Sequence, residues 1–416
     1  MKFIPAIFFA LLLQVSALSQ SVIRGRVVAS SNGSPIPGCS VFITNTSRGT
    51  TADANGQFEL TGIPPGKHDL VVSSVGYETI VYSFSESQLP LQLRFEMDIK
   101  AKEMANLVLE ESVEEGWEKW GVTFMENFIG TVPNAKLCRI KNEKSIRFRY
   151  YKKSNRVIAY CDEPLQIENK ALGYTIRYQL ENFEVNFKIG SISYLGYSLY
   201  EPMEAGNGNK QRKWMEKRKE AFYGSVMHFM RCLYHDSLAQ AGFVVTRMQR
   251  EPNTEKQRVR AVYGKKVMLL GENNNNGGRV VIGSNPAVET PGDSSKYYTS
   301  VMRQPDYLDR YDTAVLTADS IIGGVSGDVK LISFENFLFV TYNKAKEEEE
   351  YVRLQYPVRK ASVQRSWVQL SGSMVVALDM NGNYFDPQEF VTTGYWGWRE
   401  KMANSLPQDF DPGESQ

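Results

Sequence analysis

The sequence lacks any large excess of charge. It has 48 lysines and arginines against 47 aspartates and glutamates, and its formal net charge is +1. Proteins that bind nucleic acids or charged membranes through a strong overall field need a larger imbalance. Beyond its first residues the chain also lacks an apolar run of the roughly 20 residues that a membrane-spanning helix needs. We therefore expect no nucleic-acid partner and no transmembrane segment in the mature chain.

Cysteine is scarce as well, with four residues among 416. In an oxidising compartment, four cysteines permit disulfides without requiring them. Cys138 and Cys161 are the favoured pair, because they lie in neighbouring strand-like segments, KLCRI and VIAYCDE. Other pairings stay open, and so does burial of all four as free thiols.

The first residues have the three-part layout of a secretory signal peptide. One lysine precedes the apolar run FIPAIFFALLL, and Ala17 and Ser19 then form an A-x-S cleavage site. We expect a signal peptide over 1–19, with Gln20 as the first residue after cleavage, and export to the periplasm or cell surface of a Gram-negative-type bacterium. An uncleaved anchor helix is the alternative. The cleavage point has no cysteine, so we do not expect a lipid anchor on a terminal cysteine.

Residues 20–98 alternate between apolar and polar side chains. In CSVFI, for example, Cys39, Val41 and Ile43 share one face of a strand. Turn signals separate the strands, among them Asn55-Gly56 and the segment PPG at 64–66. Short strands at this spacing predict an antiparallel β-sandwich.

This segment resembles the carboxypeptidase-like regulatory domain, a transthyretin-like β-sandwich of about seven strands. The resemblance covers about a fifth of the chain and rests on Gly25, the Pro35–Gly38 turn, Gly49-Thr50, Asp53 to Phe58, Pro65-Gly66 and Gly76-Tyr77. It implies a module that accompanies another activity. Within it, DANG could suggest a calcium loop, but the glycine comes one place early and no glutamate closes a 12-residue loop. A hairpin turn is favoured there.

Several enzyme classes are excluded by missing motifs. A zinc carboxypeptidase needs an H-x-x-E pair, and none of His68, His228 and His235 has a glutamate three places on. The chain also lacks G-x-S-x-G and S-x-x-K, two common serine hydrolase arrangements. Paired carboxylates for glycoside hydrolysis stay open, because 47 acidic residues leave many candidates. We assign no catalytic residue and no cofactor.

The rest of the chain predicts a mainly β, α+β fold. Residues 99–130 read as a linker and a helix whose aromatic stripe, including Phe124 and Phe128, ends at Gly130. Residues 131–408 read as a β-rich α+β domain with one long helix, and 409–416 as a loose tail. This part is similar only to uncharacterised envelope proteins that carry the same first domain.

The long helix is expected over 206–243, with Asn209 and Gly242 as its caps and a core face that includes Phe222 and Phe229. A basic cluster lies in its first turns: Lys210, Arg212, Lys213, Lys217, Arg218 and Lys219. A solvated face is the plain interpretation, and a site for an anionic glycan or lipid head group is the functional alternative.

His228, Cys232 and His235 lie at positions i, i+4 and i+7 of the same helix. Their side chains suit zinc or copper. The outer two are about 10 Å apart along the helix axis, so one ion would reach only two of the three. We therefore expect a packed face, and no metal, with a metal site as the alternative.

Further strands are expected at 259–270 and 278–284, around the asparagine tract 273–276. Another hairpin is expected from FENFLFVTYN and YVRLQYPV, and a further one at Asn381-Gly382. A short helix with Trp396 and Trp398 closes the domain.

The preferred interpretation is an exported, non-enzymatic binding or structural protein. Its β-rich C-terminal domain would bind an envelope protein, a glycan or a surface through aromatic and Lys/Arg-bearing patches. The alternatives are a periplasmic hydrolase with glycosidase-like paired carboxylates, and an accessory to an outer-membrane transport system. A barrel receptor is excluded, because about 300 residues cannot supply a plug and some 22 strands.

Overall fold

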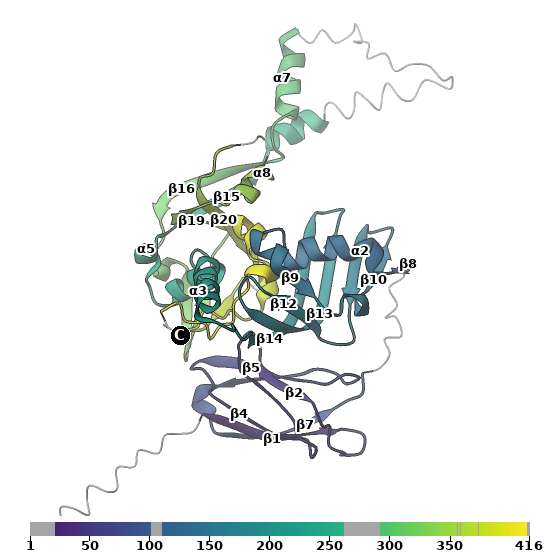
Figure 1. Ribbon diagram of the computed structural model, residues 1–416. Coiled ribbons are helices and arrows are strands. Elements are labelled where there is room, and N and C mark those ends of the chain that lie inside the picture. Colours follow the sequence, from purple (N-terminus) through teal and green to yellow (C-terminus); the bar gives the residue numbers. More distant parts are fainter. Residues whose placement is uncertain are drawn as a thin grey trace, which may run out of the picture.

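The structure, a computed structural model, describes residues 21–100, 110–261 and 292–413, apart from 356, 358 and 373. The expected signal peptide, with its cleavage point between Ser19 and Gln20, lies outside these ranges. So do the asparagine tract and the strand expected at 278–284. The described residues form five β-sheets with helices packed beside them (Figure 1). This confirms the mainly β, α+β fold class.

The N-terminal sandwich has seven strands in two sheets, in the orders β4-β1-β7 and β3-β2-β5-β6. Their bounds are β1 Val22–Ala29, β2 Ser40–Ile43, β3 Gly49–Thr51, β4 Gln57–Thr61, β5 Lys67–Ser73, β6 Ile80–Ser85 and β7 Leu91–Met97. Cys39, Val41 and Ile43 are fully buried between the sheets, as their alternation predicts. One pairing differs from the expected antiparallel order, because β1 and β7 run parallel.

The turn at Asp53–Gly56 is not a hairpin, although the sequence predicted one. β3 and β4 belong to different sheets, so the turn carries the chain across the sandwich. Asp53 closes it by accepting hydrogen bonds at Oδ1 from the backbone N–H groups of Asn55 and Gln57, both at 2.8 Å. The asparagine–glycine pair indicated a turn correctly but not which strands it joins.

A seven-stranded antiparallel sheet follows, in the order β8-β10-β11-β13-β12-β9, with β14 also paired to β13. Its strands are β8 Ser112–Glu115, β9 Cys138–Ile140, β10 Arg147–Tyr151, β11 Arg156–Tyr160, β12 Leu165–Asn169, β13 Tyr174–Asn186 and β14 Ser191–Pro202. Helix α2, Trp117–Phe124, continues as a π-turn over Met125–Ile129. It ends at Gly130, as predicted, and Phe124 and Phe128 are fully buried against the sheet.

The segment 206–243 forms three helices instead of one: α3 Gly208–Phe222, α4 Val226–Tyr234 and α5 Leu238–Ala241. Gly224 has φ +81° and interrupts the helical backbone, and the Ser225 side chain then caps α4. Asn207, rather than the expected Asn209, caps α3. Gly242 closes α5 in the left-handed conformation, as predicted.

The C-terminal part has a five-stranded sheet, β16-β15-β19-β20-β22, and a three-stranded sheet, β17-β18-β21. The strands are β15 Phe243–Pro252, β16 Tyr307–Val315, β17 Ile322–Ser326, β18 Val329–Ile332, β19 Phe337–Lys346, β20 Val363–Leu370, β21 Val376–Leu378 and β22 Phe390–Gly394. The helices are α7 Gly292–Met302, α8 Glu349–Arg353 and α9 Tyr395–Arg399. Short 3-10 turns cover Glu86–Gln88, Pro133–Leu137, Glu143–Ser145, Ala318–Ser320, Pro387–Glu389 and Met402–Asn404.

Two expected strands are helical at least in part. Residues 254–261 are helical, and Asn253 caps this helix by accepting from the Lys256 N–H at 3.0 Å. The rest of the strand expected at 259–270 lies outside the described ranges. α8 replaces the strand expected at YVRLQYPV, because Glu349 and Glu350 start a helical turn there.

The C-terminal segment, here residues 400–413, contacts both the N-terminal sandwich and the β-rich body of the molecule. The N-terminal sandwich lies against β14, where the Ser198 hydroxyl donates to Asn45 (Figure 1). The C-terminal segment also contacts the sandwich, because the Ser47 hydroxyl donates to Asp409. Arg231 donates hydrogen bonds to the carbonyl groups of Asn381, Gln408 and Phe410. Phe410 is buried and Asp409 pairs with Arg48, so the start of the expected loose tail is docked. Among the described residues, no helix has the length and apolar content needed to cross a bilayer.

Candidate functional site

The outer face of the five-stranded sheet carries aromatic side chains. In a strand with one buried face, successive side chains alternate between the core and the solvent. In β19, Leu338 and Val340 point into the core while Phe339 points outward. In β20, Val368 is fully buried and Trp367 points outward. This face therefore holds large apolar side chains that the core does not use.

Three of these side chains form a continuous ladder across the sheet, here called the aromatic ladder: Tyr311, Phe339 and Trp367. The ring centroids of Tyr311 and Phe339 are 4.9 Å apart, and those of Phe339 and Trp367 are 5.3 Å apart. The Trp367 Nε1–H donates a hydrogen bond to the Tyr311 hydroxyl at 3.2 Å. Tyr311 is nevertheless 47% exposed. The rings are thus fixed by one another and open to solvent.

Gly394 makes room for the indole of Trp367. Its φ is +74°, and a Cβ atom at this position would lie 2.6 Å from the Trp367 ring. A side chain there would meet both a strained backbone and a clash. Glycine at this point of β22 therefore lets the indole lie across the neighbouring strand.

A hollow of about 950 Å³ lies beside the ladder and is here called the sheet groove. Besides the ladder and Gly394 it is lined by Glu347, Tyr351, Gln355, Arg359, Lys360, Ser362 and Arg365. Arg359 holds Glu347 with two hydrogen bonds, from Nη1 at 2.6 Å and from Nη2 at 2.8 Å. Ser362 donates two more to the same carboxylate, from its N–H and its hydroxyl, both at 3.0 Å.

These contacts fix the charge of the groove. Burial alone would raise the pKa of Glu347, but the hydrogen bonds from Arg359 and Ser362 outweigh it and the pKa is lowered. Glu347 is therefore an anion whose charge Arg359 neutralises. Lys360 and Arg365 are exposed at the same groove, which leaves it with a positive balance.

The basic cluster predicted at the start of α3 is divided between the interior and the surface. Arg218 is buried, donates to the carbonyl groups of Leu172 at 2.7 Å and Gly173 at 3.2 Å, and stacks on Tyr174 at 4.0 Å. It cannot act as a surface contact, so that part of the prediction is wrong.

The other members of the cluster lie on the exposed side of α3. Lys210 lies over the Trp214 ring, Arg212 donates to Asn209, Lys217 pairs with Glu220, and Lys213 is exposed. A ligand-binding role for Lys210, Arg212, Lys213 and Lys217 stays a prediction.

The three metal candidates lie in different surroundings. His228 is packed among aromatic rings, with Phe222 at 4.9 Å and Phe243 at 5.1 Å between centroids. Its Nδ1 accepts a hydrogen bond from the Gly224 N–H at 3.1 Å. Cys232 is buried, whereas His235 lies at the C-terminal cap of α4. Within the described ranges, no three His, Cys, Asp or Glu side chains are grouped so that they could hold a metal ion.

All four cysteines are free thiols, so the Cys138–Cys161 disulfide that the sequence left possible is absent. β9, which begins at Cys138, is separated from β11, which ends just before Cys161, by β13 and β12. Three strand spacings amount to about 14 Å, whereas a disulfide needs Cα atoms within about 7 Å of each other. Strand-like neighbours in sequence are not neighbours in this sheet.

The aromatic ladder was not among the sites predicted from the sequence. FENFLFVTYN was read correctly as a strand, but its outward position Phe339 was not separated from its core positions. The available signal was an aromatic residue out of phase with the buried positions of the same strand, as in Trp367 of VQRSWVQL.

Fold and site together define a β-sandwich module joined to a β-rich body that carries an aromatic, arginine-flanked groove. Residues 23–109 match the model of the CarboxypepD_reg-like domain, so the N-terminal sandwich belongs to this domain family. The expected resemblance is thereby confirmed. Among curated proteins, no sequence matches this chain.

Solved structures show only distant similarity. A 9R-lipoxygenase from Cyanothece has 9% identity and a TM-score of 0.15, over 54% of this chain and 49% of the lipoxygenase chain. A protein of unknown function from Bacteroides fragilis has 7% identity and a TM-score of 0.14, over 90% and 94%. A DUF3823 family protein from Bacteroides uniformis has 10% identity and a TM-score of 0.14, over 45% and 86%. Similarities of this size define no shared overall fold.

Proposed function

We propose that this is an exported envelope protein without catalytic activity, and that its C-terminal part binds a glycan chain in the sheet groove. The observation that carries the proposal is the aromatic ladder, three rings in edge and tilted contact that are held in place on a solvent-facing sheet. The predicted signal peptide and the CarboxypepD_reg-like domain, a module that accompanies other activities, support the export and the accessory role.

The chemistry of the groove suits a sugar chain. Sugar rings have apolar C–H faces that pack on flat aromatic rings, while their hydroxyl and carboxylate groups need polar partners. Gln355, Lys360 and Arg365 supply such partners beside the ladder. Because the three rings already hold one another in place, binding loses little side-chain entropy. The positive balance favours an acidic glycan over a neutral one.

The same groove offers little for hydrolysis. A glycosidase needs two carboxyl groups about 5 to 9 Å apart, and Glu347 is the one carboxylate among the described residues that line this groove. Arg359 and Ser362 occupy both of its oxygen atoms. A hydrolase with paired carboxylates elsewhere in the chain, or a transport accessory, ranks second.

The test is affinity electrophoresis of the full chain in gels that contain acidic or neutral polysaccharides. We expect retardation by an acidic polysaccharide and at least about fivefold weaker binding by Trp367→Ala, because a stacking platform of this size contributes about 1–3 kcal/mol. Tyr307→Ala is the matched control. Tyr307 is an exposed aromatic residue of β16, the strand that carries Tyr311, and it does not line the groove. Equal loss in both variants, or no retardation by any polysaccharide, would reject the proposal.

A further inference from the structure

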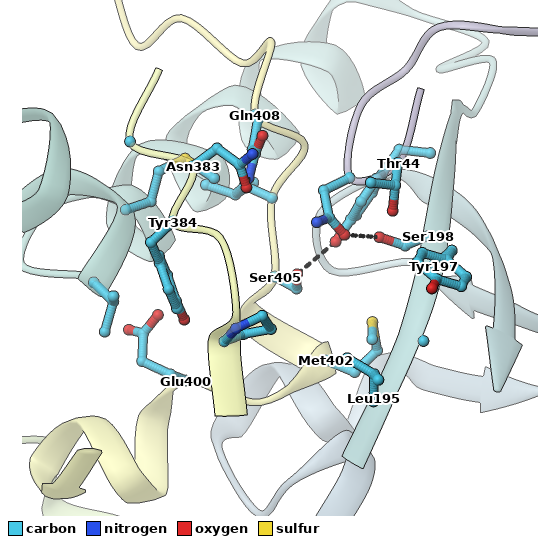
Figure 2. A pocket seen from close by; sticks show the side chains of 18 of the residues that line it. Thr44, Leu195, Tyr197, Ser198, Asn383, Tyr384, Glu400, Met402, Ser405 and Gln408 are labelled. Atoms are coloured by element: carbon cyan, nitrogen blue, oxygen red, sulfur yellow. Dashed lines mark hydrogen bonds between the residues drawn. The ribbon is translucent and has the colours of Figure 1, made fainter. Parts of the chain in front are cut away.

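A second cavity, of about 500 Å³, lies where the N-terminal sandwich, β14 and the C-terminal segment meet. It is here called the junction cavity, and its walls include Thr44 from the sandwich, Tyr197 and Ser198 from β14, and Glu400 and Gln408 from the C-terminal segment (Figure 2). It lies apart from the sheet groove and shares no lining residue with it.

Most polar groups of the junction cavity already have partners. The Ser198 hydroxyl donates to Asn45, and the Gln408 side chain donates to Asn383 at 2.6 Å. Such pairs shape a wall but leave few free donors or acceptors. Groups without partners are therefore the ones that would select a ligand.

One such group, the Glu400 carboxyl, lies at the same wall as the hydroxyls of Tyr384 and Tyr194. Figure 2 shows the Tyr384 hydroxyl and the Glu400 carboxyl directed toward the same part of the cavity. Glu400 Oε1 is buried and has no hydrogen-bond partner among the described residues. Both tyrosines line the same cavity and interact electrostatically with that carboxyl group. The Val226 N–H, at the start of α4, is the backbone donor that faces the carboxyl.

The charges around Glu400 do not balance. Arg399 lies 3.7 Å from the Glu400 carboxylate and 3.5 Å from Glu348, so one guanidinium serves two carboxylates. Its Nη1 and Nη2 donate hydrogen bonds to the carbonyl groups of Ala221 and Glu220, whereas its Nε has no hydrogen-bond partner among the described residues. If both acids are ionised, this cluster carries a net negative charge that a further cation would compensate.

The lysines of the junction cavity do not supply that cation. Lys401 lies over the Tyr194 ring at 5.7 Å from its centroid, and Lys67 lies over Phe385 at 4.5 Å. Arg399 is the one described cation in ion-pair contact with Glu400. No second cation among the described residues pairs with Glu400, and its carboxyl group lines the cavity.

We propose that the junction cavity binds a small hydroxyl-bearing molecule through a primary ammonium group. The ammonium would donate its three hydrogens to the Glu400 carboxylate and to the hydroxyl oxygens of Tyr384 and Tyr194. The bond between Gln408 and Asn383 leaves Asn383 Nδ2 and Gln408 Oε1 outside it, and these two groups suit the hydroxyl groups of the ligand. A neutral polyol would satisfy the hydroxyl contacts but leave the negative cluster uncompensated.

Protonation of Glu400 gives the proposal a pH signature. Burial raises the pKa of Glu400 to about 7, against the opposing effects of Arg399 and the Val226 N–H. An aliphatic ammonium stays charged between pH 5.5 and 8, whereas the carboxyl ionises as the pH rises through 7. Affinity should therefore rise with pH, and a group with a pKa of about 7 predicts about 30-fold weaker binding at pH 5.5 than at pH 8.

The test is calorimetric titration of the full chain with 1-amino-1-deoxysorbitol and with its neutral counterpart sorbitol. We expect the amine to bind at pH 8, sorbitol to bind at least tenfold more weakly, and the affinity for the amine to fall at pH 5.5. Glu400→Gln should abolish the pH dependence, and Tyr384→Phe should weaken binding several-fold with the pH dependence intact.

Asp386→Asn is the matched control, because Asp386 also lines the cavity but lies outside the cluster. It should bind the amine within about threefold of the unmodified chain. Trp367→Ala should also retain amine binding, which separates this site from the sheet groove. Equal affinity for amine and polyol, no binding of the amine to the folded chain at pH 8, or an unchanged pH dependence in Glu400→Gln would overturn the proposal.

Discussion

Gly56 is held by two independent constraints. Its φ is +74°, a region that β-branched residues avoid, and a Cβ atom there would lie 2.4 Å from the Val27 carbonyl oxygen. The first constraint is visible in the sequence as an Asn-Gly turn. The second is not, because Val27 belongs to β1 and reaches Gly56 only after the sandwich closes.

Gly56→Val should therefore lower the free energy of unfolding by about 3 kcal/mol or more. Gln57→Ala is the control, since Gln57 is exposed at the start of β4, and it should change the free energy by less than about 0.5 kcal/mol. Urea unfolding of the full chain measures both. Equal stability of the two variants would show that the turn relaxes.

His228 makes stability depend on pH. Burial lowers its pKa to about 4, with the positive charges of Lys344 and Arg231 acting in the same direction. The folded chain thus holds His228 neutral at pH 5, whereas the unfolded chain binds a proton below about pH 6.5. Stability is lost as the pH falls from 6.5 to 4, by up to about 3 kcal/mol.

His228→Gln should cost about 0.5 to 3 kcal/mol at pH 8, because it disturbs a packed aromatic environment. It should also remove the part of the pH dependence that lies between 6.5 and 4. Urea unfolding at several pH values measures both effects. If the variant keeps the full pH dependence, another group is responsible. Stoichiometric metal that is lost in the variant would instead favour the zinc or copper alternative.

At the scale of elements, periodicity predicted most of the strands but not the helices at 254–261 and α8, and it failed where backbone geometry decides. Phe222 and Val226 keep the helical spacing across the break between α3 and α4, so the apolar pattern continues while the helix does not. The positive φ of Gly224 and the Ser225 cap produce the break. A Gly-Ser pair inside a helical pattern was the available signal.

Arg218 illustrates the same limit for charged residues. The run of basic residues predicted a surface cluster that includes Arg218, but Arg218 lies near the C-terminal end of α3 and its side chain donates to the carbonyl groups of Leu172 and Gly173. The available signal was its spacing, because Arg218 lies four residues from both Trp214 and Phe222 and so shares their buried face of the helix.

Arg218→Ala should therefore destabilise the chain by about 2 to 4 kcal/mol, through two lost charge-assisted hydrogen bonds and lost packing. Lys213→Ala, an exposed position of the same helix, should have almost no effect. Thermal and urea unfolding compare the two. An Arg218→Ala variant with full stability and reduced ligand binding would restore the surface interpretation.

For the whole molecule, the sequence indicated the sandwich and its family well, because turns and alternation are local. It could not indicate the docking of the C-terminal segment. Arg231 joins residues about 180 positions apart, and the Asp409 carboxylate pairs with Arg48 at 3.2 Å from the other end of the chain. The sheet groove is hidden for the same reason, since Tyr311, Phe339 and Trp367 come from three separate strands.

The central claim is that a glycan binds on the aromatic ladder, and fluorine NMR of the full chain labelled with 5-fluorotryptophan tests it most directly. The chain has six tryptophans, so each gives one signal, and Trp367→Phe assigns the signal of Trp367. On addition of an acidic polysaccharide we expect the Trp367 signal to shift while that of the buried Trp396 stays in place. Polysaccharide binding that leaves the Trp367 signal unchanged would contradict the account.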